Sequence, residues 1–321
     1  MILNMDMIDT KKIQQHCYTR SPKGLFRKSE GYDTVARSNG LPEDFITERL
    51  HSFCYYHPSR LMQAKRLPSE EFPRAVTVVH FPEGLTMIGQ TVYVEADYTG
   101  QRSTFFTHNY VIPSCNPVVQ EFCPTLLNKL DFFTSTCWEH LHELDELPYH
   151  QEAEIASLGP LPFEERRLRQ LIYTLLESIT GTKKVYVSLP GQDWVMPVLM
   201  WLYEHLPSDA AKLLGFTTYS REPENKKFLH LTFIDKGCIN INDQALERDY
   251  IFDFDSGNFS ANLPAVSDTI LEEAKLNFVS TLEKAVKERE EEERELQLSD
   301  LVGEKKLKKE NLIERIRRKF N

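Results

Sequence analysis

Several features that would assign a class of protein at once are missing from this 321-residue sequence. No apolar run approaches the roughly 18 residues of a membrane helix. Residues 1–12 place Asp6 and Asp9 ahead of their only basic residues, which is the reverse of a secretory signal. The six cysteines are scattered, and a chain of this length needs no disulfides to build a core. We therefore expect a folded, soluble protein of the reducing cytoplasm.

The sequence also lacks the motifs of nucleotide hydrolysis and of nucleophilic catalysis. There is no Gly-x-x-x-x-Gly-Lys-Ser/Thr loop, no Gly-x-Gly-x-x-Gly after a strand, and no Gly-x-Ser-x-Gly elbow. The turn at residues 188–193 could hold an anion with its amides, but it has no lysine and is typical of a connecting turn. The formal net charge of -10 argues against nonspecific nucleic-acid binding. We predict no catalytic residues, no metal and no cofactor.

The pattern of apolar residues predicts an α/β (α+β) protein with a β-rich first part. Residues 74–80, 91–96 and 104–112 read as strands, the last two as a hairpin. Residues 42–51 and 126–144 are predicted to be helical. The Gly-Pro-rich residues 159–162 indicate a linker. The predicted mixed α/β domain before it comprises residues 10–150.

The pattern in the second part of the chain predicts a smaller middle domain at residues 160–262. Apolar residues recur from Leu168 to Ile179 at helical spacing, and Gly181 suits a left-handed helix end. Residues 184–220 read as a β-α-β unit with parallel strands. The strand at 228–234 is predicted to be antiparallel to the strand before it, and 250–254 adds one more.

The chain ends in a predicted charged helical arm, residues 266–321. An apolar face at Ile270, Leu271 and Phe278 runs into the very acidic residues 287–295, and a basic stretch follows Gly303. The basic stretch could meet an acidic partner or lie free in solvent.

Two sets of side chains raise the question of chemistry. In residues 137–146, Cys137 with His140 and His142 with Glu146 lie about one helical turn apart, which fits either metal ligands or a solvated helix face. Cys17 or Cys115 could meet His108 in three dimensions to form a hydrolase dyad. Packed cysteines and a hydrogen-bonded core histidine account for the same residues.

Three polar segments of the first domain exceed what folding requires, namely residues 14–20, 31–42 and 97–110. In this order they resemble the N-terminal domain, type two, of bacterial GTPase-associated proteins of conflict systems. The middle domain of those proteins is similar, more loosely, to residues 163–234. The stretch from Asp97 to His108 is the most specific part of the resemblance.

The resemblance implies a non-catalytic adaptor that binds a GTPase encoded nearby, or assembles a complex around it, in defence or signalling. The residues expected to contact the partner are Tyr18, Arg20, Arg37, Asp97, Tyr98, Arg102 and His108. Within the turn, Asp97 is expected to cap the amides and to pair with Arg102. One rival is a cryptic Cys/His hydrolase; another is a regulator that inserts Arg20, Arg37 or Arg102 into the GTPase site.

Overall fold

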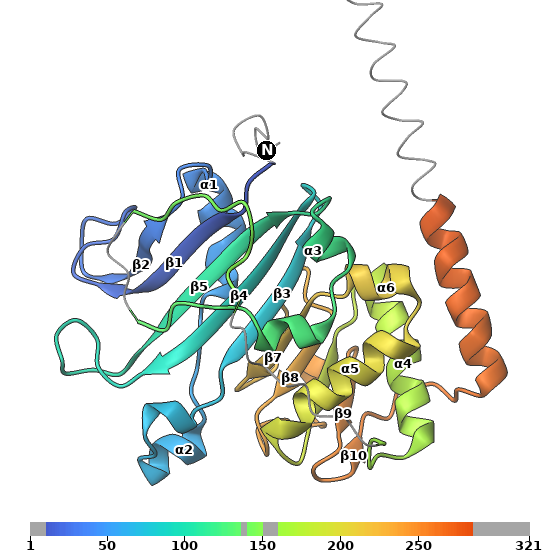
Figure 1. Ribbon diagram of the computed structural model, residues 1–321. Coiled ribbons are helices and arrows are strands. Elements are labelled where there is room, and N and C mark those ends of the chain that lie inside the picture. Colours follow the sequence, from blue (N-terminus) through green and yellow to red (C-terminus); the bar gives the residue numbers. More distant parts are fainter. Residues whose placement is uncertain (1–10, 136–139, 150–159, 285–321) are drawn as a thin grey trace, which may run out of the picture. The chain divides into compact units, whose positions relative to one another are not determined.

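The computed structural model describes residues 11–135, 140–149 and 160–284, and within them ten strands form one sheet (Figure 1). The strand order is β10-β9-β6-β8-β7-β3-β4-β5-β1-β2. The strands are β1 (Gln14–Ser21), β2 (Gly31–Arg37), β3 (Ala75–Phe81), β4 (Leu85–Val94), β5 (Thr104–Pro113), β6 (Val185–Ser188), β7 (Phe216–Ser220), β8 (Leu231–Ile234), β9 (Tyr250–Asp253) and β10 (Asn258–Phe259). The main helices are α1 (Glu43–Phe45), α2 (Arg60–Lys65), α3 (Pro117–Gln120), α4 (Glu165–Thr180), α5 (Val195–His205) and α6 (Ser208–Leu213). The predicted α/β class is confirmed.

The sheet has an antiparallel half and a parallel half. Strands β2, β1, β5, β4 and β3 pair in antiparallel fashion, whereas β7, β8, β6 and β9 are parallel neighbours. The hairpin of β4 and β5 and the β-α-β unit from β6 to β7 are as predicted. Strand β8 is parallel to β7, so the antiparallel prediction was wrong. The connection through residues 221–230 is longer than a hairpin turn and brings β8 back in the same direction, between β7 and β6.

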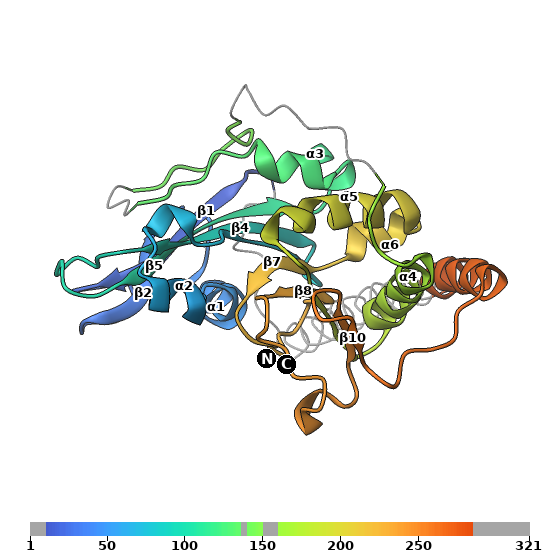
Figure 2. The same ribbon diagram turned by 90° about the horizontal axis from the view of Figure 1, so that it is seen from below.

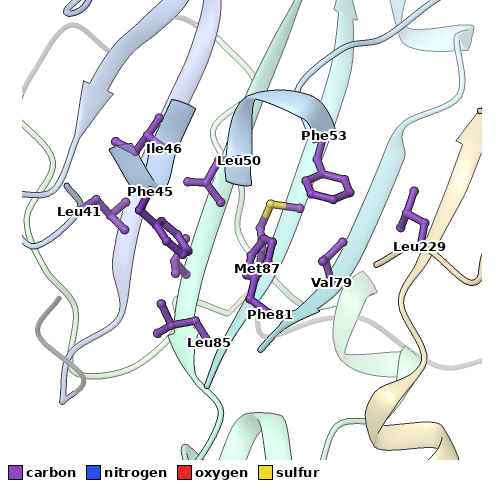
Figure 3. Close-up of a cluster of buried hydrophobic side chains, with 11 residues drawn as sticks. Leu41, Phe45, Ile46, Leu50, Phe53, Val79, Phe81, Leu85, Met87 and Leu229 are labelled. Carbon is purple, nitrogen blue, oxygen red and sulfur yellow. The ribbon is translucent and has the colours of Figure 1, made fainter. Parts of the chain in front are cut away.

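A helical segment covers one face of the antiparallel half (Figure 2). It runs from α1 through a π turn, Ile46–Leu50, and a 3-10 turn, His51–Phe53, in agreement with the predicted helix at 42–51. Its apolar side chains meet strands β3 and β4 (Figure 3). The resulting core contains Leu41, Phe45, Ile46, Leu50, Phe53, Val79, Phe81, Leu85, Met87, Val111 and Leu229. Each such side chain contributes roughly 1.5–3 kcal/mol by burial.

On the opposite face, the helix predicted at residues 126–144 is absent from the described residues. Only Pro124–Asn128 is helical, as a 3-10 turn, and residues 131–135 and 140–144 have no helix. Leu144 exchanges two backbone hydrogen bonds with Ile13, each 2.8 Å long, and Leu130 bridges to Tyr149. The segment has no continuous apolar stripe, so pairing with distant backbone outweighs a weak helical tendency.

Helix α4 carries the predicted apolar stripe, with Leu171 and Leu175 fully buried. Gly181 after it has φ -126°, so the expected left-handed helix end was wrong. Residues 268–284 are helical as predicted, and the chain divides at Leu271 into a compact unit and a second unit that begins at Glu272. The basic end of the predicted arm lies outside the described residues. Among the helices described, none has the length and apolar character needed to cross a membrane.

Candidate protein-binding surface

Arg20, at the end of β1, joins three segments of the first half of the chain. Its Nη1 lies 2.6 Å from Asp97 Oδ2 in the β4–β5 turn, and its Nη2 contacts Glu30, just before β2. The side chain of Arg20 is 13% exposed and that of Asp97 is fully covered. A guanidinium shared between two carboxylates gives directional, charge-assisted hydrogen bonds. This ion pair therefore fixes the hairpin tip against β1 and the loop before β2.

Asp97 also shapes its own turn. Its Oδ1 accepts the Thr99 amide at 2.9 Å and the Thr99 hydroxyl, and its backbone amide donates to the Arg102 carbonyl at 2.6 Å. Gly100 supplies the φ of +72° that the turn requires. The hydrogen bond from the Thr99 hydroxyl, followed by other bonds and the Arg20 charge, lowers the pKa of Asp97. The predicted capping role is present, but the ionic partner of Asp97 is Arg20 and not Arg102.

Aromatic rings line the same end of the sheet. Tyr32 and Phe105 stack with centroids 4.6 Å apart, and Tyr18 lies 6.3 Å from Phe105. Tyr55 meets Phe105 edge-on at 6.3 Å and is 48% exposed. Burial and a hydrogen bond to Tyr55 raise the pKa of the Tyr18 hydroxyl. The buried rings hold Tyr55 at the surface, where aromatic side chains are frequent anchors for protein partners.

Tyr98 and Arg102 complete the exposed part of this surface. Tyr98 is 39% exposed, and burial followed by a hydrogen bond to Glu30 raises the pKa of its hydroxyl. Arg102 is exposed, and no carboxylate within the described ranges pairs with its guanidinium. We call Tyr55, Tyr98 and Arg102 the hairpin-end surface. It presents aromatic area and one available cation on a braced support.

Family models match two consecutive parts of the chain. Residues 12–148 match the model of GTPase-associated protein 1, N-terminal domain type 2, and residues 151–256 match that of the middle domain of GTPase-associated protein 1. The chain belongs to the GTPase-associated protein 1 family. A comparison with curated proteins gave no match.

The family assignment supports a GTPase-linked role in general, and it locates the predicted residues. All seven lie in the GTPase-associated N-terminal domain. The structure brings Arg20, Asp97 and Tyr98 together around Glu30, with Arg102 in the same turn, whereas Tyr18 is buried among the rings of Tyr32, Tyr55 and Phe105. Arg37 lies at the other end of β2, where it donates to the Leu41 carbonyl and stands 5.4 Å from the Phe26 ring centre.

His108 is fully buried in the GTPase-associated N-terminal domain, on the face of the sheet away from α1. Its Nδ1 accepts the Phe133 amide at 3.1 Å, so Nε2 carries the proton and donates to Gln15 Oε1 at 3.2 Å. Burial lowers the pKa of His108 to about 3. Cys17 is its register partner on β1 and is also fully buried. Both ring nitrogens are occupied, which favours a structural histidine over a catalytic base.

A second polar network was missed in the sequence. Asn109 Nδ2 lies 3.1 Å from His16 Nδ1 and 3.4 Å from Cys54 Sγ, and the Thr34 hydroxyl bridges His16 and His51 at 2.9 Å each. These residue types are those of a cysteine hydrolase. Burial, however, raises the pKa of Cys54 to about 12, so the thiol stays protonated at neutral pH. Alternate polar residues on β1 and β5 were the available signal, but Cys54 reaches them only through the fold.

The proposed metal ligands of residues 137–146 fall partly outside the described residues, which exclude Cys137. His140 and His142 have ring centres 5.9 Å apart, and residues 140–146 are not helical, so the expected helical turn between His142 and Glu146 is absent. Within the described part of the chain, no group of three or more His, Cys, Asp or Glu side chains could hold a metal.

Proposed function

We propose that the protein is a non-catalytic cytoplasmic adaptor that binds a small GTPase, or assembles a complex around one, in a bacterial conflict, defence or signalling system. The family match supports the link to a GTPase. The hairpin-end surface supports the docking role, because it combines exposed Tyr55 and Tyr98 with the available Arg102. Tyrosine and arginine are enriched among residues that dominate binding energy.

Among the arginines considered for a regulator, the structure favours Arg102 as the one that could reach a partner. Arg20 bridges Asp97 and Glu30, and Arg37 is held by the Leu41 carbonyl. Withdrawing either would break hydrogen bonds to partly buried groups. An adaptor and an arginine-inserting regulator therefore share the same docking residue and differ in their effect on GTP hydrolysis.

The test is co-expression with the GTPase encoded beside the gene, followed by affinity measurement. We expect Arg102→Ala and Tyr98→Ala each to weaken the complex by about 30-fold or more, which corresponds to about 2 kcal/mol. Arg166→Ala, at an exposed position on α4, is the matched control and should bind as the parent does. If all variants bound the GTPase with the affinity of the parent protein, the hairpin-end surface would not be the interface.

Single-turnover GTP hydrolysis by the same complex separates the adaptor from the regulator. An adaptor leaves the rate of the GTPase nearly unchanged. An inserted arginine raises it by about 10³–10⁵-fold, and Arg102→Ala would abolish that gain. The hydrolase alternative paired Cys17 or Cys115 with His108. Titration of the thiols with iodoacetamide at pH 7 should leave the buried Cys17 and Cys54 unmodified in the folded protein, whereas the exposed Cys115 should react without removing any function of the protein.

A further inference from the structure

A cleft of about 600 Å³ lies on the face of the sheet opposite the α1 core. Its floor is formed by Val76, Gln90 and Thr218 from β3, β4 and β7, and its walls include Phe132 and Met196. Val76 and Gln90 are register partners, and side chains alternate along a strand, so they point away from the core of Figure 3. Helix α5 lies over this face (Figure 2). The volume falls within the range of small-molecule sites.

Gln90 supplies a carboxamide to the floor of the cleft. The residue is only 7% exposed, and no group of residues 11–135, 140–149 or 160–284 hydrogen-bonds its carboxamide, whose atoms remain accessible from the cleft. A carboxamide that is open to the cleft and has no protein partner is free to bind a ligand. A carboxamide carries a donor and an acceptor side by side. This arrangement complements a ligand edge that carries an acceptor next to a donor.

One end of the cleft is suited to an anion. Arg74 precedes Val76 by two residues, about 7 Å along the strand, and its guanidinium has no carboxylate partner in the part of the chain that the structure describes. The Arg74 carbonyl accepts the Thr218 hydroxyl, and the Thr218 carbonyl accepts Gln192 Nε2 at 2.9 Å. Through Thr218, these bonds connect the backbone at Arg74 with Gln192, which precedes the eleven-residue helix α5, and the N-terminal end of the dipole of that helix adds positive potential.

Among the described residues of the lining, Asp131 carries the formal charge opposite to that of Arg74. The positive potential is therefore local to the Arg74 end, and a multiply charged anion that filled the whole cleft would meet a carboxylate. A ligand with a single anionic group at one end and a neutral body fits this distribution better.

The floor of the cleft argues against an extended peptide as the occupant. Strand β3 is paired on one side with β4 and on the other with β7, so its backbone has no free edge to which a peptide strand could add. A compact ligand, held by side chains, suits such a floor.

We propose that this cleft binds a nucleoside monophosphate. The base packs against Phe132 and Met196 and pairs its edge with the Gln90 carboxamide, while the phosphate meets Arg74. A glutamine side chain can read a donor and acceptor on a base edge, and an arginine is the common partner of phosphate. The proposal is independent of the docking role of the hairpin-end surface, which lies elsewhere on the sheet.

The test is calorimetric titration of the full chain with AMP, GMP, CMP and UMP, with each parent nucleoside, and with inorganic phosphate and benzoate. We expect at least one nucleotide to bind with a Kd between roughly micromolar and millimolar, about tenfold or more tighter than its nucleoside. No binding by any of the four would overturn the proposal. Benzoate or phosphate binding as tightly as the best nucleotide would overturn it as well.

Substitutions of the two lining residues test the role of each in nucleotide binding. Gln90→Leu and Arg74→Ala should each weaken the nucleotide about tenfold or more, and Arg166→Ala should not. Gln90→Leu should keep or raise the thermal midpoint, because no protein hydrogen bond is lost. Arg74→Ala, at an exposed position, remains informative if Gln90→Leu folds poorly. Unchanged affinity in both variants would overturn the assignment.

Discussion

At the scale of single residues, Asp97 and Arg102 have opposite surroundings within one turn. Asp97 accepts hydrogen bonds from Thr99 and Arg20, whereas Arg102 is exposed. We expect Asp97→Ala to lower the thermal midpoint by a few degrees and Arg102→Ala to leave it unchanged. Asp97→Asn keeps an acceptor for the Thr99 amide but loses the charge, so its midpoint should lie between those of the parent and of Asp97→Ala. If the thermal midpoint fell in Arg102→Ala and not in Asp97→Ala, Arg102 would be the residue that stabilises the turn.

His108 predicts a pH dependence of stability. Its pKa of about 3 in the folded protein lies below the unfolded value of about 6.5, so the unfolded chain binds the extra proton between these values. Its contribution is therefore nil above pH 7 and becomes increasingly destabilising as the pH falls toward 3. Between pH 7 and pH 5 it should remove about 2 kcal/mol from the free energy of unfolding.

Urea unfolding of the parent and of His108→Gln at several pH values measures this effect. The glutamine variant is expected to be less stable at pH 8, since it loses packing, but to show a shallower decline below pH 6.5. His80 and His230, whose pKa values burial lowers to about 4, keep a part of the decline in both proteins. Parallel curves for the two proteins would show that His108 takes up its proton in the folded state as readily as in the unfolded chain.

At the scale of elements, the pairing of β4 with β5 depends on a glycine. Gly89 is opposite Asn109, and a Cβ at Gly89 would lie 2.0 Å from Asn109 Oδ1. The Asn109 side chain is held by His16 and Cys54, so it cannot turn away without losing hydrogen bonds. Gly89→Ala should therefore cost about 1–3 kcal/mol of unfolding free energy.

A double-mutant cycle tests the cause of that cost. In the Asn109→Ala background the clash is gone, so Gly89→Ala should cost much less than it does in the parent. The measurement is urea unfolding of the four proteins. An equal cost in both backgrounds would show that the conformational freedom of Gly89, rather than the close approach of Asn109, is what the strand needs.

The sequence pattern predicted correctly those strands and helices that are determined by residues close together in the chain. The strands of the β4–β5 hairpin and helix α4 follow from alternation and from helical spacing, and both are present. The helix expected at 126–144 failed because Leu144 pairs with Ile13, far away in the sequence. The direction of β8 failed because the turn at 222–225 does not set the route of the longer connection.

The candidate site shows the same limit. The turn chemistry of Asp97 could be predicted from Thr99 and Gly100 beside it. Its ion pair with Arg20 could not, because the two residues meet only when β1 lies next to β5. The nearer Arg102 was a reasonable choice by sequence distance and was wrong. Neither the cleft nor the role of Gln90 in it could be predicted from the sequence, because a single polar residue in a strand is common at a solvent-exposed surface.

At the scale of the whole molecule, strands from both family-matched regions form one sheet. Strand β3 belongs to the region that matches the N-terminal domain type 2, and β7 to the region that matches the middle domain. Their junction includes a hydrogen bond of 2.9 Å between the hydroxyls of Thr77 and Thr217. The division at 10–150, 160–262 and 266–321 stays a prediction, and a shared sheet predicts that its first two parts unfold together.

The side chain of Thr218 carries the most informative bond of this junction. Its hydroxyl accepts the Val76 amide at 2.8 Å and lies 3.3 Å from the Arg74 carbonyl, to which it donates. Thr218→Val keeps the shape of the side chain but leaves the amide without this partner, which should cost about 1–3 kcal/mol. Thr218→Ser keeps the hydroxyl and is the matched control, with a smaller loss from the missing methyl group.

Two probes of one urea titration decide whether the junction couples the two regions. Trp194 and Trp201 lie in the region that matches the middle domain, so tryptophan fluorescence is weighted toward that region, whereas far-ultraviolet circular dichroism follows the whole sheet. If the shared sheet unfolds as one unit, both midpoints coincide in the parent, and Thr218→Val lowers both by the same amount. Midpoints that separate in the parent would mean that β3 and β7 are adjacent without being energetically coupled. Midpoints that separate only in Thr218→Val would show that this one hydroxyl maintains the coupling.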